Sequence, residues 1–286
     1  MIPKIIHQTY SDKSKIPAIF QSNIEELICR NPDWEYRFYD DEGRASFILN
    51  EYGEDMLCLY RRIDSRYGAA RADFFRYLLL YRVGGVYLDI KSTVVGRLSD
   101  VIGDDVSYLI SQWDNGPNGR EKGAGIHPKY GVDSEYQQWF IVAEKGHPYL
   151  AAVIDRVCQN IRNYNALESR VGMSGVLRTT GPIAYTLAIK PILDMHSHEC
   201  VDIYDLGFRY TCIPNDVGGS QHRKMIPSYR DIRFPIVKLD SNSSFSAKFW
   251  QVVAVLIAVL HEASKWGGIQ AKIVGLKRKI KGRPVA

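Results

Sequence analysis

The chain has 286 residues, of which 45% are hydrophobic and 24% charged. This composition is typical of a globular protein and excludes disordered, collagen-like and disulfide-rich chains. The longest apolar run, 252–260, is much shorter than the ~20 residues that a membrane-spanning helix needs. The first residues do not have the pattern of a signal peptide. Five widely spaced cysteines without a C-x-x-C pair are typical of a reducing compartment.

The net charge of +5 is concentrated at the C-terminus, where residues 261–286 carry +6 and leave −1 for the remainder. A basic segment indicates an anionic partner such as a membrane surface, or it is a solvated charged end. Apolar residues recur at helical spacing from Ile269 to Ile280 among lysines. This pattern predicts either an interfacial amphipathic helix or a surface helix packed on the body. The neutral body argues against nucleic acid as a partner.

The first predicted elements alternate between strand and helix. Residues 4–9 are predicted to form a strand, and Pro17 opens a helix that extends to Arg30. Its apolar face is predicted to carry Ile19, Ile24, Leu27 and Ile28. Residues 34–39 alternate as a half-buried strand does. Strand, helix and strand in this order predict an α/β fold with parallel pairing.

The most informative stretch begins with a helix predicted over residues 69–82. Its almost continuous apolar surface indicates burial on most sides. Asp73 and Arg76 lie three residues apart and therefore share one face of the helix.

Two glycines, Gly84 and Gly85, then end the helix, since glycine accepts the left-handed conformation of a C-cap. Residues 86–90 are predicted to form a short buried strand. Asp89 lies at the carboxyl end of this strand, where open α/β sheets bind their ligands.

The remaining elements are predicted more briefly. The glycine-rich segment 114–125 is expected to form a flexible loop that can cover a site. Residues 249–260 are expected to form either a core helix or a buried strand. Between these segments the patterns predict strands over 106–111 and 139–143, helices over 148–162 and 182–190, and an extended stretch over 201–210.

Four residues of the central stretch form a candidate site: Asp73, Arg76, Tyr87 and Asp89. Charged groups on apolar elements are costly to bury unless they are paired. One interpretation is a structural Asp–Arg pair that braces helix against strand. The other is a polar site that holds sugar hydroxyls, ribose or a cation with its phosphates.

The motif Asp73-x-x-Arg76-Tyr77, followed by Gly84-Gly85-Val86-Tyr87-Leu88-Asp89, resembles the sugar-binding region of DXD glycosyltransferases of retaining family 32. Further segments resemble that family in the same order along the chain: 2–10, Asn31-Pro32-x-Trp34-x-Tyr36, Gly146-His147-Pro148 and Thr180-Gly181-Pro182. The resemblance extends to about residue 230.

The resemblance implies a GT-A-like α/β domain over residues 1–245, with a Rossmann-type mixed sheet flanked by helices. Residues 246–286 would then be an apolar segment plus a basic C-terminal extension. The implied activity is hexosyl transfer, with retention, from a UDP- or GDP-sugar to a glycan or lipid-linked acceptor. With the extension on an anionic membrane surface, the expected location is cytoplasmic and peripheral to the inner face of the membrane.

The resemblance also implies roles for individual residues. Thr9 and Tyr10 match the segment that contacts the nucleotide base. Asp73 and Arg76 match residues that hold the donor sugar, and Asp89 matches one that contacts ribose or sugar near the metal. The remaining implied donor contacts are Tyr87 and the closing segment Ser228-Tyr229.

The chain departs from the family at one position, because its motif reads Asp89-Ile90-Lys91 instead of Asp-x-Asp. The second carboxylate normally binds Mn²⁺ or Mg²⁺, whereas a lysine ammonium repels a cation. Lys91 either replaces the metal as a point charge or points away and leaves the metal to Asp89. A third interpretation is a scaffold that binds nucleotide sugars or a membrane surface without catalysis.

Overall fold

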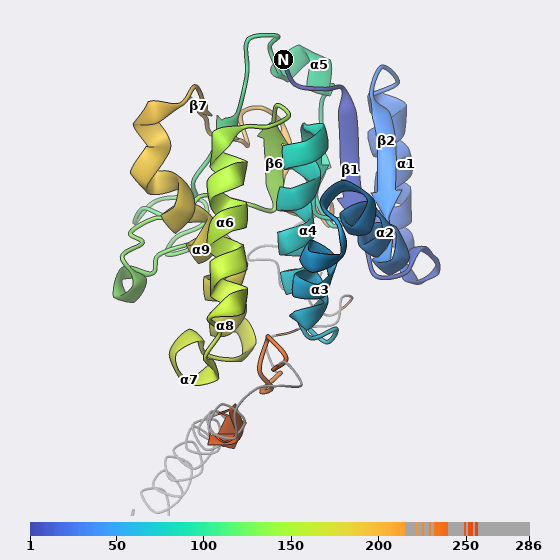
Figure 1. Cartoon of the computed structure of the whole chain (residues 1–286). Coiled ribbons are helices and arrows are strands. Elements are labelled where there is room, and N and C mark those ends of the chain that lie inside the picture. Colours follow the sequence, from blue (N-terminus) through green and yellow to red (C-terminus); the bar gives the residue numbers. More distant parts are fainter. Residues whose placement is uncertain are drawn as a thin grey trace, which may run out of the picture.

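The structure is a computed structural model that describes residues 1–214, 232–239 and isolated positions between 221 and 256. Its helices and strands are shown in Figure 1. In chain order they are β1 (Ile5–Thr9), η1 (Lys13–Lys15), α1 (Ala18–Arg30), β2 (Glu35–Tyr39), α2 (Asp41–Tyr52), α3 (Glu54–Arg62), α4 (Gly68–Val83), β3 (Gly85–Leu88), β4 (Thr93–Val94), α5 (Leu98–Val101), β5 (Leu109–Ile110), η2 (Pro128–Tyr130), β6 (Phe140–Ala143), α6 (Pro148–Arg162), α7 (Ala166–Ser169), α8 (Gly172–Thr179), α9 (Pro182–Ile189), η3 (Lys190–Met195), β7 (Glu199–Cys200) and β8 (Phe208–Arg209).

The central sheet has the strand order β2-β1-β3-β6. Strands β2, β1 and β3 are parallel, with Ile6 opposite both Tyr36 and Val86. Strand β6 runs antiparallel to β3, with Leu88 opposite Phe140. The carboxyl ends of the three parallel strands and the amino end of β6 therefore meet at one edge of the sheet.

The two faces of the sheet pack against different layers. Tyr87 and Ile141 belong to the hydrophobic cluster that contains the buried side of α4 and α6, and Figure 1 shows these two helices side by side across one face. Val86 and Leu88 point the other way, into the cluster that includes Leu27 of α1. Because both faces are covered, β3 and β6 are apolar and buried at every position, as is typical of strands inside a sheet with two covered faces.

The predicted α/β fold is confirmed: a mixed sheet is flanked by helices. Strands β1, β2, β3 and β6 and helices α1, α4, α6 and α9 lie where the sequence predicted them, within a few residues. The predicted end of α4 is also confirmed. Gly84 caps this helix with φ 73° and donates its backbone N–H to the carbonyl of Leu80.

Some predictions from the sequence were wrong. On the predicted apolar face of α1, Ile19 and Ile28 are exposed, whereas Leu27 is buried and Ile24 half-buried as predicted. Phe20 and Asn23 complete the buried side. The stretch 201–210 is mainly turns, with the two-residue strand β8 near its end. Helices α2, α3 and α8 were not anticipated.

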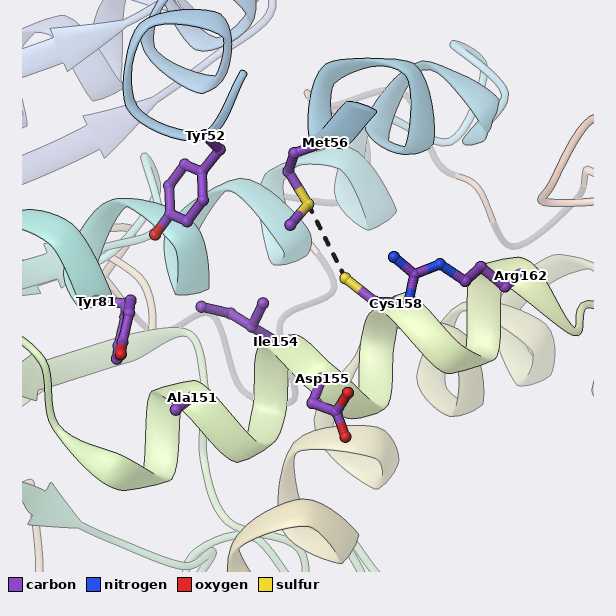
Figure 2. Close-up of a pocket in the computed structure, with 8 residues that line it drawn as sticks. All are labelled: Tyr52, Met56, Tyr81, Ala151, Ile154, Asp155, Cys158 and Arg162. Atoms are coloured by element: carbon purple, nitrogen blue, oxygen red, sulfur yellow. Dashed lines mark hydrogen bonds between the residues drawn. The ribbon is translucent and has the colours of Figure 1, made fainter. Parts of the chain in front are cut away.

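A cavity of about 310 Å³ lies among the helices that cover one face of the sheet (Figure 2). None of the candidate site residues lines it. Its walls come from α2, α3, α4 and α6: Tyr52, Met56, Tyr81, Ala151, Ile154, Asp155, Cys158 and Arg162.

The predicted basic extension over 261–286 lies outside the described residues. In segment 249–260, the described positions are helical, which favours the helix over the strand. Phe249, Val252 and Leu256 are exposed there, so core burial is wrong for these residues. Within the described part of the chain, no helix is both long and apolar enough to cross a membrane.

Candidate sugar-nucleotide site at the carboxyl edge of the sheet

The alternation of side chains along β3 determines which layer Asp89 faces. Tyr87 points toward α4, and Asp89, two residues further on, follows it to the same side. Asp89 continues the sheet by donating its backbone N–H to the Trp139 carbonyl at 2.8 Å. The chain then turns, with the Ser92 N–H bonded to the Asp89 carbonyl at 2.8 Å. The strand thus delivers a carboxylate to the edge of the sheet beside α4.

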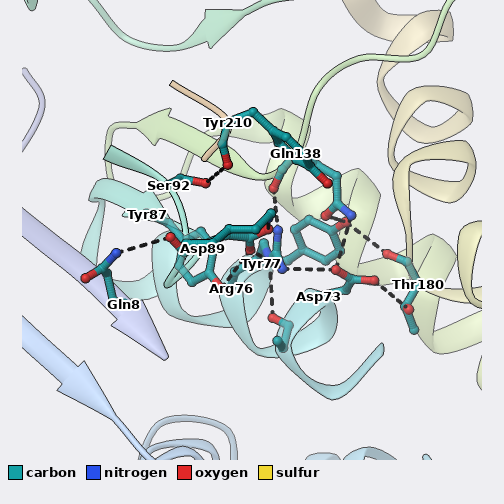
Figure 3. A network of polar contacts seen from close by, with 12 residues as sticks. Gln8, Asp73, Arg76, Tyr77, Tyr87, Asp89, Ser92, Gln138, Thr180 and Tyr210 are labelled. Atoms are coloured by element: carbon teal, nitrogen blue, oxygen red, sulfur yellow. Dashed lines mark hydrogen bonds and ion pairs between the residues drawn. The ribbon is translucent and has the colours of Figure 1, made fainter. Parts of the chain in front are cut away.

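Helix α4 supplies the acid and the guanidinium that meet Asp89 (Figure 3). Arg76 Nη2 lies 3.1 Å from Asp73 Oδ1 and 3.0 Å from Asp89 Oδ1. The guanidinium also lies over the Tyr87 ring, 4.5 Å from its centroid. The prediction that helix and strand bring these charged groups together is confirmed by this geometry.

Exposure falls from the edge of the sheet inward. The Asp89 side chain is 23% exposed, whereas those of Arg76 and Asp73 are 4% and 5% exposed. Asp89 is therefore the member of this cluster best placed to meet a ligand directly. Arg76 and Asp73 brace it from the inside, as the structural interpretation of the sequence proposed.

The polar atoms of Asp73 are satisfied by neutral donors as well as by Arg76. Gln138 Nε2 donates to its Oδ1 and Thr180 Oγ1 donates to its Oδ2, both at 3.1 Å. Arg76 Nη1 donates to the Gln138 carbonyl at 2.5 Å. Tyr77 OH lies 2.7 Å from Gln138 Oε1 and 2.9 Å from the Thr180 carbonyl. These bonds hold the buried ion pair in one geometry.

Lys91 folds back onto Asp89 across the turn. Its Nζ donates to Asp89 Oδ2 at 2.6 Å and lies 4.3 Å from the centroid of the Tyr210 ring. Only 9% of the lysine side chain is exposed. The interpretation in which Lys91 points away from the site is therefore wrong, because the turn returns its ammonium to the carboxylate.

Burial and neighbouring charges act on these groups in opposite directions. Burial alone would lower the pKa of Lys91, but the Asp89 carboxylate raises it above its ordinary value. Burial likewise opposes the charge of Arg76, and Asp89, Tyr87 and Asp73 raise its pKa above the usual range. Burial raises the pKa of Asp73, which Arg76 partly offsets. Both cations are therefore charged at neutral pH.

The ends of β1 and β2 contribute polar groups to the same edge. Gln8 Nε2 donates to the Asp89 carbonyl at 3.2 Å and its Oε1 accepts from Tyr36 OH at 3.1 Å. Thr9 donates its hydroxyl to the Tyr39 carbonyl at 2.6 Å. Tyr10 is half-buried and packs on the small cluster that contains Ile90. The base-contacting role implied for Thr9 and Tyr10 stays a prediction.

The late segment is only partly described. Ser228 lies outside the described residues. Tyr229 packs against the large hydrophobic cluster of α4 and α6, and its carbonyl accepts from the Ile232 N–H at 3.3 Å. Its predicted contact with the donor diphosphate stays a prediction.

Gln138, Tyr210 and Ser92 are parts of this network that the sequence analysis missed. Gln138 lies two residues before Phe140, the first residue of β6. Only the antiparallel direction of that strand brings Gln138 to the carboxyl edge of β3. Tyr210 directly follows β8, far along the chain from β3. Ser92 Oγ donates to the Tyr210 carbonyl at 2.9 Å. Gln138 could have been identified from the sequence only if the antiparallel direction of β6 had been predicted.

The residues at this edge do not fit a divalent cation. Both oxygens of Asp89 already contact cations, Arg76 on Oδ1 and Lys91 on Oδ2. Asp73 is buried and bonded to Gln138 and Thr180. Among the residues that the structure describes, no group of three or more His, Cys, Asp or Glu side chains is arranged to hold a metal ion.

The carboxyl edge of the parallel strands, where these charged groups meet, is where open α/β sheets bind their ligands. Residues 17–108 match the family model described as "Glycosyltransferase sugar-binding region containing DXD motif". The match contains the helix and strand that build the site. Over these residues the chain is similar to the sugar-binding region of DXD glycosyltransferases.

Two fungal relatives match different lengths of the chain. An inositol phosphoceramide mannosyltransferase from Schizosaccharomyces pombe is 39% identical over 31% of this chain and 24% of its own length. An initiation-specific alpha-1,6-mannosyltransferase from the same organism is 24% identical over 68% of this chain and 49% of its own. The chain therefore spans between a quarter and a half of the length of these relatives.

Among solved structures, the chain is similar to the PaToxG glycosyltransferase, with a TM-score of 0.46 and 16% sequence identity, over 90% of this chain and 86% of that one. A glycosyltransferase involved in glycosylation of the major capsid of PBCV-1 has a TM-score of 0.38 and 13% identity, over 78% and 98%.

Proposed function

We propose that this protein is a retaining hexosyltransferase that moves a sugar from a UDP- or GDP-sugar donor to a glycan or lipid-linked acceptor in glycoconjugate synthesis. The observation that carries the proposal is the convergence of Asp73, Arg76 and Asp89 at the carboxyl edge of the sheet. Both fungal relatives are named mannosyltransferases, which supports mannose as the hexose.

Breaking the anomeric bond creates positive charge on the sugar and negative charge on the departing diphosphate. Asp89 is the exposed acid of the cluster and accepts hydrogen bonds from hydroxyl groups of the ribose or sugar. Arg76 holds Asp89 in place through an ion pair at 3.0 Å. Lys91 places a positive charge beside the same carboxylate. Fixed charges in a partly buried site stabilise developing charge without having to reorganise.

The test is donor turnover by the purified protein with a panel of UDP- and GDP-sugars. Asp89→Ala should lower the turnover number at least about a hundredfold, the order of magnitude expected when an oriented polar group is lost from a charged transition state. Asp104→Ala is the matched control, because Asp104 is exposed and lies outside this cluster. Turnover should be unchanged in the control.

The noncatalytic interpretation makes a different prediction for the same experiment. A scaffold would bind a nucleotide sugar without releasing nucleoside diphosphate, in wild type and in both variants. The absence of turnover for every donor, with folded protein and with or without Mn²⁺, would contradict the enzymatic proposal.

We further propose that residues 261–286 dock the protein on an anionic membrane surface at the cytoplasmic face. The net charge of +6 in this segment supports this. Each lysine or arginine close to an anionic membrane adds about 1 kcal/mol of attraction, and several together are enough for stable peripheral binding.

A further inference from the structure

We propose that Lys91 supplies the positive charge that a divalent cation supplies at an Asp-x-Asp site, so that this protein binds its nucleoside diphosphate donor without a metal. The inference rests on the proposed function. It concerns how the donor phosphates are recognised, whereas the proposed function concerns which group is transferred.

The first support is the charge of the cluster. The cluster pairs two acids, Asp73 and Asp89, with two cations, Arg76 and Lys91, at ion-pair distances. A carboxylate at position 91 would leave two negative charges uncompensated, which one divalent cation would neutralise. The cluster with Lys91 therefore offers an incoming diphosphate the same net charge as an Asp-x-Asp cluster already loaded with metal.

The second support is the occupancy of the only exposed carboxylate of the cluster. Lys91 Nζ lies 2.6 Å from Asp89 Oδ2, and Arg76 Nη2 lies 3.0 Å from Asp89 Oδ1. A metal ion bound to either oxygen would have to displace a cation or lie beside it. Like charges at such distances repel strongly where water is scarce.

The third support is that the lysine is built into the site. The turn that follows Asp89 returns the side chain to that carboxylate, and the Lys91 carbonyl accepts the Cys212 N–H at 2.7 Å. The ammonium lies over the Tyr210 ring, 4.3 Å from its centroid. A lysine that is held between an acid and an aromatic face is preorganised as a fixed point charge.

The experiment measures binding of GDP and of UDP to the full chain by calorimetry, once in EDTA and once in excess Mn²⁺. The wild type should bind at least one of the two nucleotides. Its dissociation constants for that nucleotide in the two buffers should agree within about threefold. Electron paramagnetic resonance of Mn²⁺ should show no tight site on the protein alone.

Lys91→Asp recreates the Asp-x-Asp motif and should reverse this behaviour. Its affinity for the nucleotide in EDTA should fall at least about tenfold, and Mn²⁺ should restore it. Lys91→Arg keeps the charge and should bind in both buffers. Lys190→Asp is the matched control, since it makes the same charge change at an exposed lysine and should bind as the wild type does.

Circular dichroism establishes that each variant is folded. If Lys91→Asp does not fold, the wild type and Lys91→Arg still decide the question in the two buffers. Wild-type binding at least about tenfold tighter in Mn²⁺ than in EDTA would overturn the inference and leave the proposed function standing. Absence of nucleotide binding in both buffers, together with absence of turnover, would instead overturn the proposed function.

Discussion

At the level of single residues, His7 is a buried titratable group that supports the frame of the site. It lies in the middle strand of the parallel set, and its Nε2–H donates to the Gly84 carbonyl at 3.0 Å. Its Nδ1 faces Tyr39 OH at 3.4 Å. Burial lowers the pKa of His7 from 6.5 to about 4, against the opposing effect of the Gly84 hydrogen bond. The residue is neutral in the folded protein at neutral pH.

This burial predicts a pH dependence of stability. Below pH 6.5 the unfolded chain binds a proton at His7 that the folded chain does not bind until about pH 4. The free energy of unfolding should therefore fall as pH decreases through this window, by up to about 3 kcal/mol from His7. Urea unfolding of the wild type and of His7→Gln, near pH 7 and near pH 4.5, checks this.

The glutamine can still donate to the Gly84 carbonyl, but it does not titrate. Between the two pH values, the free energy of unfolding of His7→Gln should fall by about 2 to 3 kcal/mol less than that of the wild type. Equal losses in the two proteins would show that His7 is not the source. Carboxylates that titrate in the same window contribute equally to both and cancel in the comparison.

At the level of elements, the connection between α4 and β3 sets the position of the whole cluster. Helix α4 ends at Val83, and two glycines lead directly into the strand. Gly85 has φ +104°, and a Cβ there would lie 2.6 Å from the Ile5 carbonyl oxygen of β1. The absence of a side chain at Gly85 therefore allows β3 to pair closely with β1. This pairing holds β3 where Asp89 meets the cluster on α4.

Gly85→Ala should be strongly destabilising, by about 2 to 4 kcal/mol, because it combines a strained backbone with a clash against backbone. Gly96→Ala is the matched control. A Cβ at Gly96 meets nothing within 4 Å, and its φ lies outside the left-handed region. Denaturant unfolding should show a change within about 0.5 kcal/mol for the control. Similar stabilities for the two variants would contradict this account of the connection.

At the level of the whole molecule, the basic segment and the sheet domain are expected to act separately. Deleting residues 261–286 should abolish sedimentation with anionic vesicles and leave donor turnover in solution unchanged. Binding of the full chain should also weaken as salt rises, because the attraction is screened over about 8 to 10 Å at physiological ionic strength. Unaltered sedimentation after the deletion would mean that this segment does not dock the protein.

The sequence by itself determined the framework of the fold. Apolar periodicity, the two glycines and the prolines at helix starts predicted β1, α1, α4, β3 and α6 with nearly correct bounds. These signals are local, since a cap or a periodic face involves residues only a few positions apart. Local signals also placed Asp73, Arg76 and Asp89 on one helix face and one strand end.

Only the tertiary structure decided which partners complete the site. Gln138 and Tyr210 come from distant segments, and the antiparallel direction of β6 has no local signature. The direction in which Lys91 points was open in the sequence, because two orientations of a turn were equally consistent with it. In the structure the Lys91 ammonium points to Asp89 Oδ2, at 2.6 Å. Long-range contacts of this kind depend on the packing of whole layers, which no window of sequence contains.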